Sequence, residues 1–295
     1  MRHGDRVPTA REFFFPEGPR DTARQEAIER AFFGSIRQKN GTYKLTYDNR
    51  LDDLNEAVAA LLPPARPLRV MDVAVSSGIS TLEWSRSLDR LGVEHAITAG
   101  DVNVNAHLVP VGPRLHVLVD GSGHPLQYEI FGRSVPNPPA RRTLPLYGPW
   151  IWLIRAALRR SNGKKGRRTV PLVSPRLIED GRIEVVEDDV LQNDSIRGRY
   201  HVVRAANVLN RDYFDERALA RIVANLRGRL VEGGLLVICT TTGDRYRGGP
   251  TSPTNDGTIF ALRGSGRLEV VGRVGSGSVL EGLVLGLDPA VGESP

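Results

Sequence analysis

Small and acidic residues follow four apolar segments of the chain, where a ligand could reach the backbone. They are Asp72, Ser76, Ser77 and Gly78 after the first segment, Asp101 after the second, Asp188 and Asp189 after the third, and Ala205, Ala206 and Asn207 after the fourth. Gly78 and the two serines allow close approach to a helix N-terminus, whose N–H groups lack partners within the helix. Asp101 stands where a carboxylate can accept both hydroxyls of a ribose, and Asp189 where a carboxylate or a neighbouring N–H can meet an adenine amine. These residues indicate a ligand that carries adenosine.

The elements that position these residues alternate between strands and helices. Short apolar runs predict strands over residues 68–75, 95–100, 182–186, 200–205 and 235–240. Helical periodicity predicts helices over 79–91 and 215–230; Asp215 is expected to cap the second, and Gly233-Gly234 to close it. This alternation is typical of parallel strands with crossover helices, in which ligands bind beyond the carboxyl ends of the strands.

The two ends of the chain add further elements. Helical spacing of apolar residues predicts helices over 21–37 and 50–62, the second ending at Pro63-Pro64. Strands are expected over 258–262 and 268–274 as an antiparallel hairpin, and over 279–285 as a last strand. We expect the tail to be flexible.

About eighty residues separate the second predicted strand from the third, far more than the roughly 10–15 that a crossover needs. We interpret this segment as an insertion. Residues 115–119 and 126–130 predict a β-hairpin around Asp120-Gly-Ser-Gly-His124, and residues 144–160 predict an aromatic helix that leads into a basic loop.

The predicted fold class is therefore α/β: a Rossmann-like, doubly wound and mostly parallel sheet with an antiparallel C-terminal hairpin, an N-terminal helical cap and a large insertion after the second strand. We expect one elaborated domain with these boundaries: the cap over 1–66, the Rossmann-like domain over 67–288 with its insertion at 104–180, and the tail over 289–295.

Four segments resemble the class I S-adenosylmethionine-dependent methyltransferases in order and spacing. They are Val70-Met-Asp-Val-Ala-Val-Ser-Ser-Gly78, Ile97-Thr-Ala-Gly-Asp-Val-Asn103, Glu187-Asp-Asp-Val190 and Val203-Arg-Ala-Ala-Asn-Val-Leu209. Within that superfamily the Ser-Ser-Gly turn, the Asp-Val-Asn segment and Asn207-Val-Leu ahead of Tyr213-Phe214 are most similar to the chemotaxis receptor methyltransferase branch. The resemblance covers about residues 68–240 without the insertion; the receptor-docking features of that branch are not recognisable.

The resemblance implies S-adenosylmethionine as cofactor and a role for each matching position. The first turn would hold the methionine part, the acid after the second strand the ribose, and the third-strand Asp with the following apolar residue the adenine. The matching positions, with those of the fourth strand, are Asp72, Ala74, Ser76, Ser77, Gly78, Asp101, Val102, Asp189, Val190, Ala205 and Asn207. Ala74 and Ser76 stand where glycines are commoner in the family.

Methyl transfer from a sulfonium mainly requires alignment, so a general base is optional. Candidates near the end of the fourth strand are Asn207, Arg211 and Tyr213. Side chains of the cap that could close over the cofactor are Tyr43, Tyr47 and Arg50, and His107 and His124 of the insertion would lie near the substrate entrance if the insertion folds back as a lid.

Several classes of function are excluded or disfavoured. The turn lacks the G-x-G-x-x-G of dinucleotide dehydrogenases, and no P-loop occurs. The six histidines have no metal spacing, so no metal is assigned, and the single cysteine, Cys239, is expected to be a buried strand residue. With no signal peptide and no spanning segment, we expect a cytoplasmic protein.

The formal charge of +6 arises largely from basic residues gathered between Arg141 and Arg168. Residues 144–168 join aromatic residues to this basic segment, which suits peripheral contact with a membrane surface or cover for an apolar substrate, whereas nucleic-acid binding is disfavoured. The alternative is a core-packed helix with a solvated basic loop.

Three functions stay open on the sequence. The first is an S-adenosylmethionine-dependent methyltransferase for a small-molecule or lipid-like acceptor. The second is a non-catalytic S-adenosylmethionine-binding or scaffold protein, for which Ala74 and Ser76 would be the signs. The third is a protein or RNA methyltransferase that docks through the basic insertion.

Overall fold

The computed structural model describes residues 6–16, 18, 22–39, 41, 43–44, 49–161, 166–192, 196–243 and 254–287. The chain divides into two compact units. Unit 1 comprises Met1–Thr46 and Asn103–Pro175, and unit 2 comprises Tyr47–Val102 and Arg176–Pro295. Each unit contains a β-sheet of its own, so the chain is an α/β protein with two sheets.

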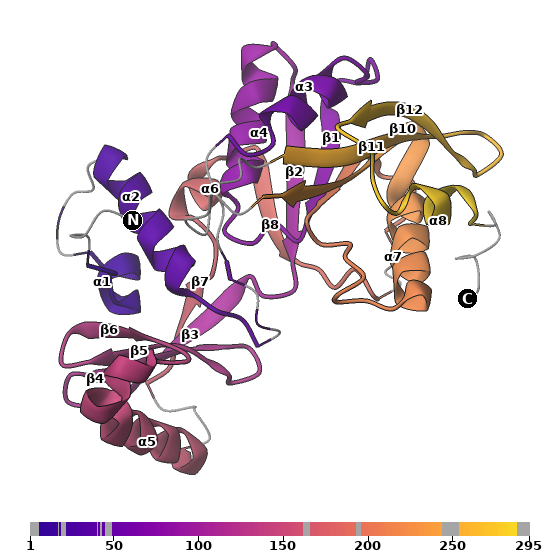
Figure 1. Ribbon diagram of the computed structural model, residues 1–295. Helices are drawn as coiled ribbons and strands as arrows, with labels where there is room; N and C mark the ends of the chain where they lie inside the picture. Colours follow the sequence, from indigo (N-terminus) through magenta and orange to yellow (C-terminus); the bar gives the residue numbers. More distant parts are fainter. Residues whose placement is uncertain are drawn as a thin grey trace. The chain divides into compact units, whose positions relative to one another are not determined.

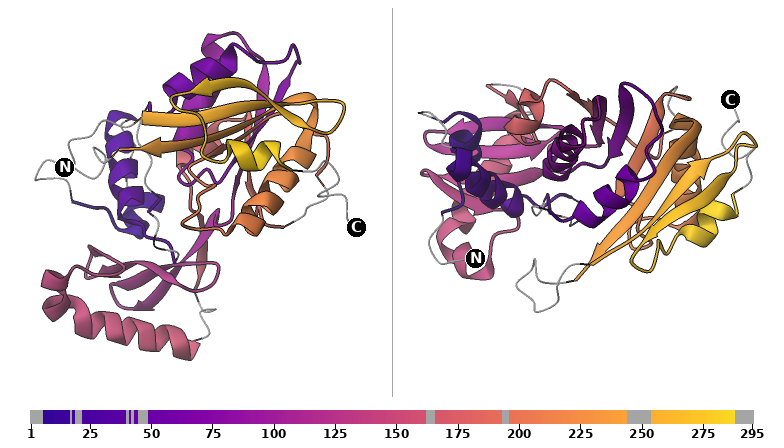
Figure 2. Two further views of the ribbon diagram at one scale, coloured as in Figure 1. Left: turned by 45° about the vertical axis from the view of Figure 1, so that its right-hand side comes forward. Right: turned by 90° about the horizontal axis from the view of Figure 1, so that it is seen from above.

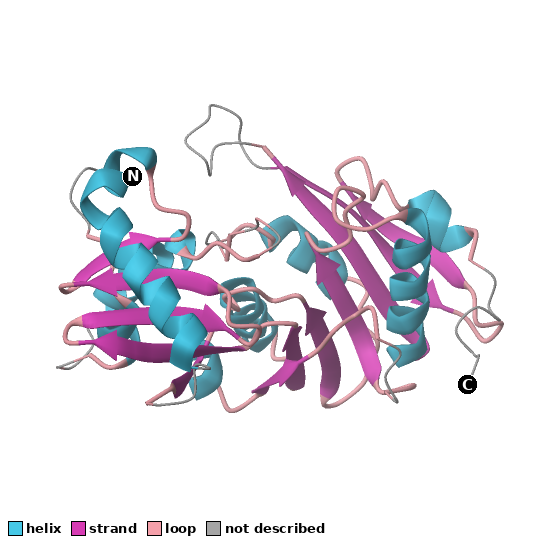
Figure 3. Ribbon diagram, turned by 90° about the horizontal axis from the view of Figure 1, so that it is seen from below, coloured by secondary structure: helices cyan, strands magenta, loops and turns pink. Residues whose placement is uncertain are grey.

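Unit 2 is built on a seven-stranded, mostly parallel sheet (Figures 1 and 3). Its strands are β1 (Leu68–Val73), β2 (His95–Asp101), β8 (Ile183–Glu187), β9 (Tyr200–Ala206), β10 (Leu230–Thr242), β11 (Thr254–Leu262) and β12 (Leu268–Val274). Their order is β12-β11-β10-β9-β1-β2-β8, with β8, β2, β1, β9 and β10 parallel and β11 and β12 added antiparallel to their neighbours. The predicted Rossmann-like sheet with an antiparallel C-terminal hairpin is confirmed.

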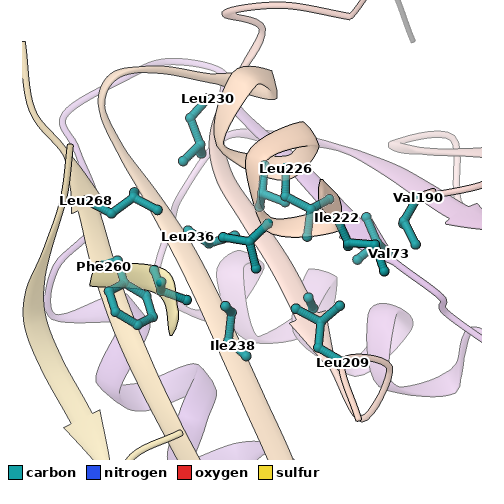
Figure 4. Packing of buried hydrophobic residues seen from close by; sticks show 14 of the residues in the cluster. Val73, Val190, Leu209, Ile222, Leu226, Leu230, Leu236, Ile238, Phe260 and Leu268 are labelled. Carbon is teal, nitrogen blue, oxygen red and sulfur yellow. The ribbon is translucent and has the colours of Figure 1, made fainter. Parts of the chain in front are cut away.

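Helices pack on both faces of this sheet. They are α3 (Asp52–Ala59), α4 (Ile79–Arg90), α6 (Pro175–Glu179), α7 (Glu216–Arg229) and α8 (Glu281–Leu285). One core of unit 2 joins α7 and α8 to one face, with Ile222, Leu236 and Phe260 fully buried (Figure 4). Asp215 caps α7 as predicted, since its Oδ1 accepts the N–H of Ala218 at 2.8 Å.

Unit 1 contains a five-stranded antiparallel sheet in the order β6-β5-β4-β3-β7. Its strands are β3 (Asn105–Gly112), β4 (Leu115–Asp120), β5 (Pro125–Ile130), β6 (Arg133–Pro136) and β7 (Arg168–Pro171). Its helices are α1 (Ala10–Phe14), α2 (Thr22–Ser35) and α5 (Leu144–Ser161), the last preceded by a 3-10 turn, η1 (Arg141–Thr143). The predicted hairpin, β4 with β5, and the aromatic helix, α5, are confirmed.

The two faces of this sheet bury different helices. Phe13 of α1 stacks on Phe32 of α2, and both pack with Leu108 and Leu118 on one face. The helix α5 covers the opposite face (Figure 2). Ile151 and Ile154 are buried there. The predicted helix over 21–37 is confirmed as α2, whereas α1 was not predicted. The Thr9 and Glu12 side chains form a capping box at its start.

Two local predictions in unit 2 were wrong. Residues 279–285 were predicted as a strand but contain α8, because Leu280 and Val284, four residues apart, are both buried on one side of a helical turn. Gly233-Gly234 does not close α7. The helix ends at Arg229, and the glycines occupy an irregularity between Leu230 and Leu235 of β10. The predicted flexible tail lies outside the described residues.

Candidate functional site

The strand order of unit 2 reverses between β1 and β9. The connection from β1 leads to β2 on one side, while β9 pairs with β1 on the other side. In open parallel sheets, ligands bind at such a reversal, beyond the carboxyl ends of the strands. The predicted site residues stand at or next to these strand ends.

The turn after β1 has a left-handed backbone at three alternate positions. The φ angles are 54° at Ala74, 60° at Ser76 and 81° at Gly78. Only the third of these is a glycine, although side chains disfavour this region by roughly 1–2 kcal/mol per residue. A fourth such angle, 61°, occurs at Asn207 after β9. Three non-glycine residues with positive φ therefore lie at the ends of two adjacent strands, at the reversal of strand order.

Asp101 links the end of β2 to this turn. Its Oδ2 accepts the backbone N–H of Ser76 at 2.8 Å, and the residue is buried. Ala74 and Ser76 are partly exposed, and Val102 is exposed. A carboxylate has about four acceptor sites and can accept several hydrogen bonds at once. Asp101, which is predicted to hold the ribose of the cofactor, thus lies directly beside the turn that is predicted to hold its methionine part.

Gly78 packs against protein side chains. A Cβ on Gly78 would lie 2.3 Å from Cδ2 of Leu177, a fully buried residue of α6. Ser77 next to it is also fully buried. Gly78 therefore provides close packing of the turn on α6, and the partly exposed residues of the turn are Ala74 and Ser76.

Asp72 forms a buried ion pair with Arg204, which stands beside it on β9. Its Oδ1 accepts from Nε of Arg204 at 2.9 Å and its Oδ2 from Nη2 at 2.6 Å, and Thr81 donates a third bond to Oδ2 at 2.6 Å. The side chains of the pair are 1% and 5% exposed, which shows that this carboxylate is used inside the protein. The structure thus gives Asp72 a positioning role beneath the turn, in place of the direct cofactor contact expected from the sequence.

Arg204 is the centre of a larger network that sequence analysis missed. Its guanidinium lies 4.1 Å from the ring centroid of Trp84 on α4 and donates to Oδ1 of Asn55 on α3 at 2.8 Å. The network therefore connects β1, β9, α3 and α4 directly below the candidate site. A signal was present in the sequence, because an arginine inside the apolar strand 200–205 requires a buried acidic partner.

The acidic pair after β8 divides between two roles. Asp188 accepts two hydrogen bonds from Arg229, at 2.8 and 2.9 Å, in a second buried ion pair. Asp189 is partly exposed, and its carboxylate accepts from the N–H of Leu191 and from the side chain of Gln192. Val190 is buried in the core beneath α7. The carboxylate of Asp188 is thus held in an ion pair, whereas that of Asp189 bonds to residues of its own loop.

Asn207 is tied to the neighbouring strand. Its Oδ1 accepts the N–H of Thr241 at 2.6 Å, and its Nδ2 donates to Oγ1 of the same threonine at 3.0 Å. Thr241 in turn donates to Asn255 of β11. Ala205 is fully buried in the core, while Ala206 is partly exposed. The amide of Asn207 therefore fixes the loop after β9.

The other catalytic candidates lie in the loop that follows. Tyr213 is 51% exposed, and Arg211 is exposed, with Nη2 3.8 Å from a carboxylate oxygen of Glu216. Arg50, of the predicted cap, precedes α3, and its carbonyl accepts from Asn255. Tyr43 is exposed in unit 1, whereas Tyr47 lies outside the described residues. Of these residues, Arg211 and Tyr213 are the exposed side chains of the loop after β9.

The predictions for histidine and cysteine concern other parts of the chain. No group of three or more metal-ligating side chains occurs within the residues that the structure describes. His107 of unit 1 contacts Thr169 and His124 contacts Asn137; burial, assisted by Arg167, lowers the pKa of His107. Cys239 is buried in β10, as predicted, and burial raises the pKa of its thiol to about 12.

Comparison with known proteins found structural likenesses only. No protein-family model matches the chain, and none of the curated proteins matches it. Similar solved structures include the CMeT domain of the citrinin polyketide synthase, with 15% identity over 64% of this chain and a TM-score of 0.32. They also include an O-methyltransferase family protein from Burkholderia thailandensis, with 17% over 68% and a TM-score of 0.33.

A third similar structure is the N-methyltransferase NodS from Bradyrhizobium japonicum in complex with S-adenosyl-L-homocysteine, with 13% identity over 70% of this chain and a TM-score of 0.32. The matches span 33% and 40% of the first two proteins and 68% of NodS. Because these TM-scores are below 0.5, the function proposed for this chain depends on its own strand order and side-chain geometry. The closer resemblance to the chemotaxis receptor methyltransferase branch stays a prediction.

Proposed function

We propose that unit 2 binds S-adenosylmethionine at the carboxyl ends of β1, β2 and β8 and transfers its methyl group to a small-molecule or lipid-like acceptor. The observation that carries this proposal is the left-handed turn at Ala74, Ser76 and Gly78, next to the carboxylate of Asp101. Strained backbone that non-glycine residues maintain is found mainly at functional sites.

The residues present fit the methionine and ribose parts of this cofactor. The small side chains of Ala74 and Ser76 permit approach to the backbone of the turn, and both are partly exposed. Asp101 places a carboxylate, which can accept hydrogen bonds from ribose hydroxyls, directly beside this turn. Asp189 can accept from an adenine amine at the end of β8. Asp72 takes no direct part and orients the turn through Arg204 and Thr81.

When bound, S-adenosylmethionine supplies an electrophilic methyl group on a sulfonium. The chain then has to hold the acceptor in line with that methyl group, and most of the rate gain comes from this positioning. Asn207 contributes by fixing the backbone after β9 through its two bonds to Thr241. Tyr213 and Arg211 are exposed in the same loop and are the side chains that could contact an acceptor.

A binding protein without transferase activity is the second candidate. The replacement of two expected glycines by Ala74 and Ser76, together with the use of Asp72 in an internal ion pair, favours it. Both candidates require cofactor binding, so binding and transfer are tested separately. A protein or RNA methyltransferase that docks through the basic insertion is the third candidate.

Calorimetric titration of the full chain with S-adenosylmethionine and with S-adenosylhomocysteine tests the binding step. We expect both to bind, and Asp101→Asn to weaken binding at least about tenfold, which corresponds to about 1.4 kcal/mol. Asparagine keeps an oxygen that accepts the N–H of Ser76, so this variant should fold. Glu184→Gln, which neutralises an exposed carboxylate within β8, is the matched control and should bind as wild type does. Failure of both ligands to bind the wild-type chain would refute both candidates.

Transfer is tested with S-adenosylmethionine that carries a radiolabelled methyl group, incubated with the chain and a cell extract. Label in the organic-solvent or small-molecule fraction supports the proposed acceptor class. Label in protein or RNA supports the third candidate instead. Binding without transfer into any fraction supports the non-catalytic candidate.

A further inference from the structure

The outer side of α5 in unit 1 carries an exposed apolar patch that the proposed function does not use. Thirteen large hydrophobic residues are exposed among the described ones, and six of them belong to α5 or to the β5–β6 turn beside it. These six, here called the α5 patch, are Phe131, Leu144, Leu146, Trp150, Trp152 and Leu153. Concentrated apolar surface of this kind marks an interaction site.

The inner side of α5 packs against the sheet of unit 1. Ile151 and Ile154 are 5% and 0% exposed, and Arg155 donates to the hydroxyl of Tyr128 and to Asn137. Trp152, by contrast, is 68% exposed. The ring of Trp150 packs edge-on against Phe131 at 4.8 Å, so the β5–β6 turn extends the patch beyond the helix. The alternative interpretation of the sequence, a helix packed in the core, therefore explains the inner side of α5 but not its outer side.

The stretch of sequence that contains the patch carries charge of a single sign. Between Glu129 and Glu179 the sequence contains eleven Lys and Arg residues and no Asp or Glu. Arg141 precedes the helix, and Arg159 and Arg160 lie in its last turn; all three are exposed. Arg159 and Arg160 form no ion pair with any residue that the structure describes. The apolar patch is thus flanked at both ends by unneutralised positive charge.

We propose that the α5 patch docks on the surface of an anionic phospholipid bilayer. Helices that lie in a membrane interface combine Trp, Phe and Leu with Lys and Arg in this way, and tryptophan favours the headgroup level. The basic residues of this segment, which has no acidic residue between Glu129 and Glu179, complement anionic headgroups. The docking is peripheral, because no helix among the described residues is long and apolar enough to cross a membrane.

Vesicle flotation and tryptophan fluorescence of the full chain test this docking without any cofactor. We expect the chain to float with vesicles of phosphatidylcholine and phosphatidylglycerol and to remain unbound with phosphatidylcholine alone. The three tryptophans are Trp84, Trp150 and Trp152, and Trp84 is 1% exposed. A blue shift of emission on binding would therefore report Trp150 and Trp152 entering the interface.

Matched variants distinguish membrane binding by the α5 patch from nonspecific adsorption of the protein to vesicles. Trp152→Ser should reduce partitioning roughly tenfold, whereas Val279→Ser, at a 72% exposed position in unit 2, should leave it unchanged. Arg159→Glu with Arg160→Glu should reduce it at least about tenfold, since each basic residue near an anionic surface contributes appreciably. Arg217→Glu with Arg221→Glu, on the exposed side of α7, is the charge-matched control.

Circular dichroism establishes that each variant is folded. The proposal is overturned if the wild-type chain ignores anionic vesicles, or if folded Trp152→Ser partitions as wild type does. It is also overturned if RNA or heparin binds through Arg159 and Arg160 while vesicles give no blue shift, which would identify a soluble polyanion as the partner. Concentration-dependent dimerisation that buries Trp152, without vesicle binding, would identify a second copy of the chain.

Discussion

At the scale of single residues, the candidate site depends on backbone conformation more than on side-chain chemistry. Ala74 and Ser76 adopt φ angles that glycine tolerates best, yet the chain keeps them at the end of β1. Sequence analysis identified these positions by their resemblance to a glycine turn. It could not determine that the backbone retains the glycine-like conformation, because φ depends on the packing around the turn.

The strain at Ala74 leads to a first prediction. Ala74→Gly removes the steric cost of the left-handed region, which exceeds the entropy that glycine adds to the unfolded chain, so we expect the free energy of unfolding to rise by about 0.5–1 kcal/mol. Urea unfolding measures this change. Ala220→Gly in the middle of α7 is the control and should lower stability by about 1 kcal/mol. A loss of stability in Ala74→Gly would show that the turn is not strained.

A second residue-scale prediction concerns His201 on β9. Its Nδ1 accepts the backbone N–H of Arg69 at 2.9 Å, and burial, assisted by the charge of Arg69, lowers its pKa from 6.5. The unfolded chain therefore binds this proton more readily than the folded chain does. The stabilising contribution is fully present above pH 6.5 and is lost as the pH falls through the folded-state pKa.

Urea unfolding between pH 8 and pH 5 checks this linkage. Stability of the wild-type chain should decline below about pH 6.5, and His201→Gln should decline less steeply because the titrating group is gone. If the variant reproduces the wild-type slope, His201 makes no contribution to the pH dependence.

At the scale of elements, buried ion pairs join the strands and helices beneath the site. Arg204 connects β9 with Asp72 of β1, and Arg229 connects α7 with Asp188 after β8. Asp72 and Arg204 are 132 positions apart in the chain, so their pairing could not be predicted without knowing that β1 and β9 are neighbours in the sheet. The strands that carry them were predicted from apolar runs alone. The pairing explains why two acids that look like ligands in the sequence serve the fold instead.

Removal of one partner from the first pair should destabilise the protein strongly. Arg204→Met leaves the carboxylate of Asp72 buried without its counter-charge, and we expect a loss of about 3–5 kcal/mol. Combined with Asp72→Leu, the loss should be smaller than the sum of the two single losses, because neither charge remains alone. Arg263→Met, in an exposed pair with Glu269, is the control and should cost no more than about 1 kcal/mol. Additive losses would contradict the coupling.

Periodicity predicted the longer elements better than the short ones. The helix α7 has apolar residues at helical spacing over fourteen positions, and it was found where expected. The five-residue helices α1 and α8 contain too few turns for a period to be recognised, and α8 was taken for a strand. The short edge strands β6 and β7 of unit 1 have four residues each and were not predicted.

At the scale of the whole molecule, each unit has a sheet, a core and a candidate surface of its own. Unit 2 contains the strand ends with Ala74, Ser76 and Asp101, and unit 1 contains the α5 patch. The insertion after the second strand predicted additional structure there, but not that α1 and α2 of the N-terminal segment would pack on one face of its sheet. Such long-range assembly depends on side chains more than seventy positions apart.

The central claim is that S-adenosylmethionine binds at the carboxyl ends of β1, β2 and β8, and its placement is measured most directly by hydrogen–deuterium exchange. Exchange is followed in the full chain with and without saturating S-adenosylhomocysteine. We predict slower exchange in peptides that cover residues 74–80 and 99–103, with no change in peptides from β4 and β5 of unit 1. Unaltered exchange over 74–80 and 99–103, in a chain that calorimetry shows to be saturated with ligand, would contradict the account.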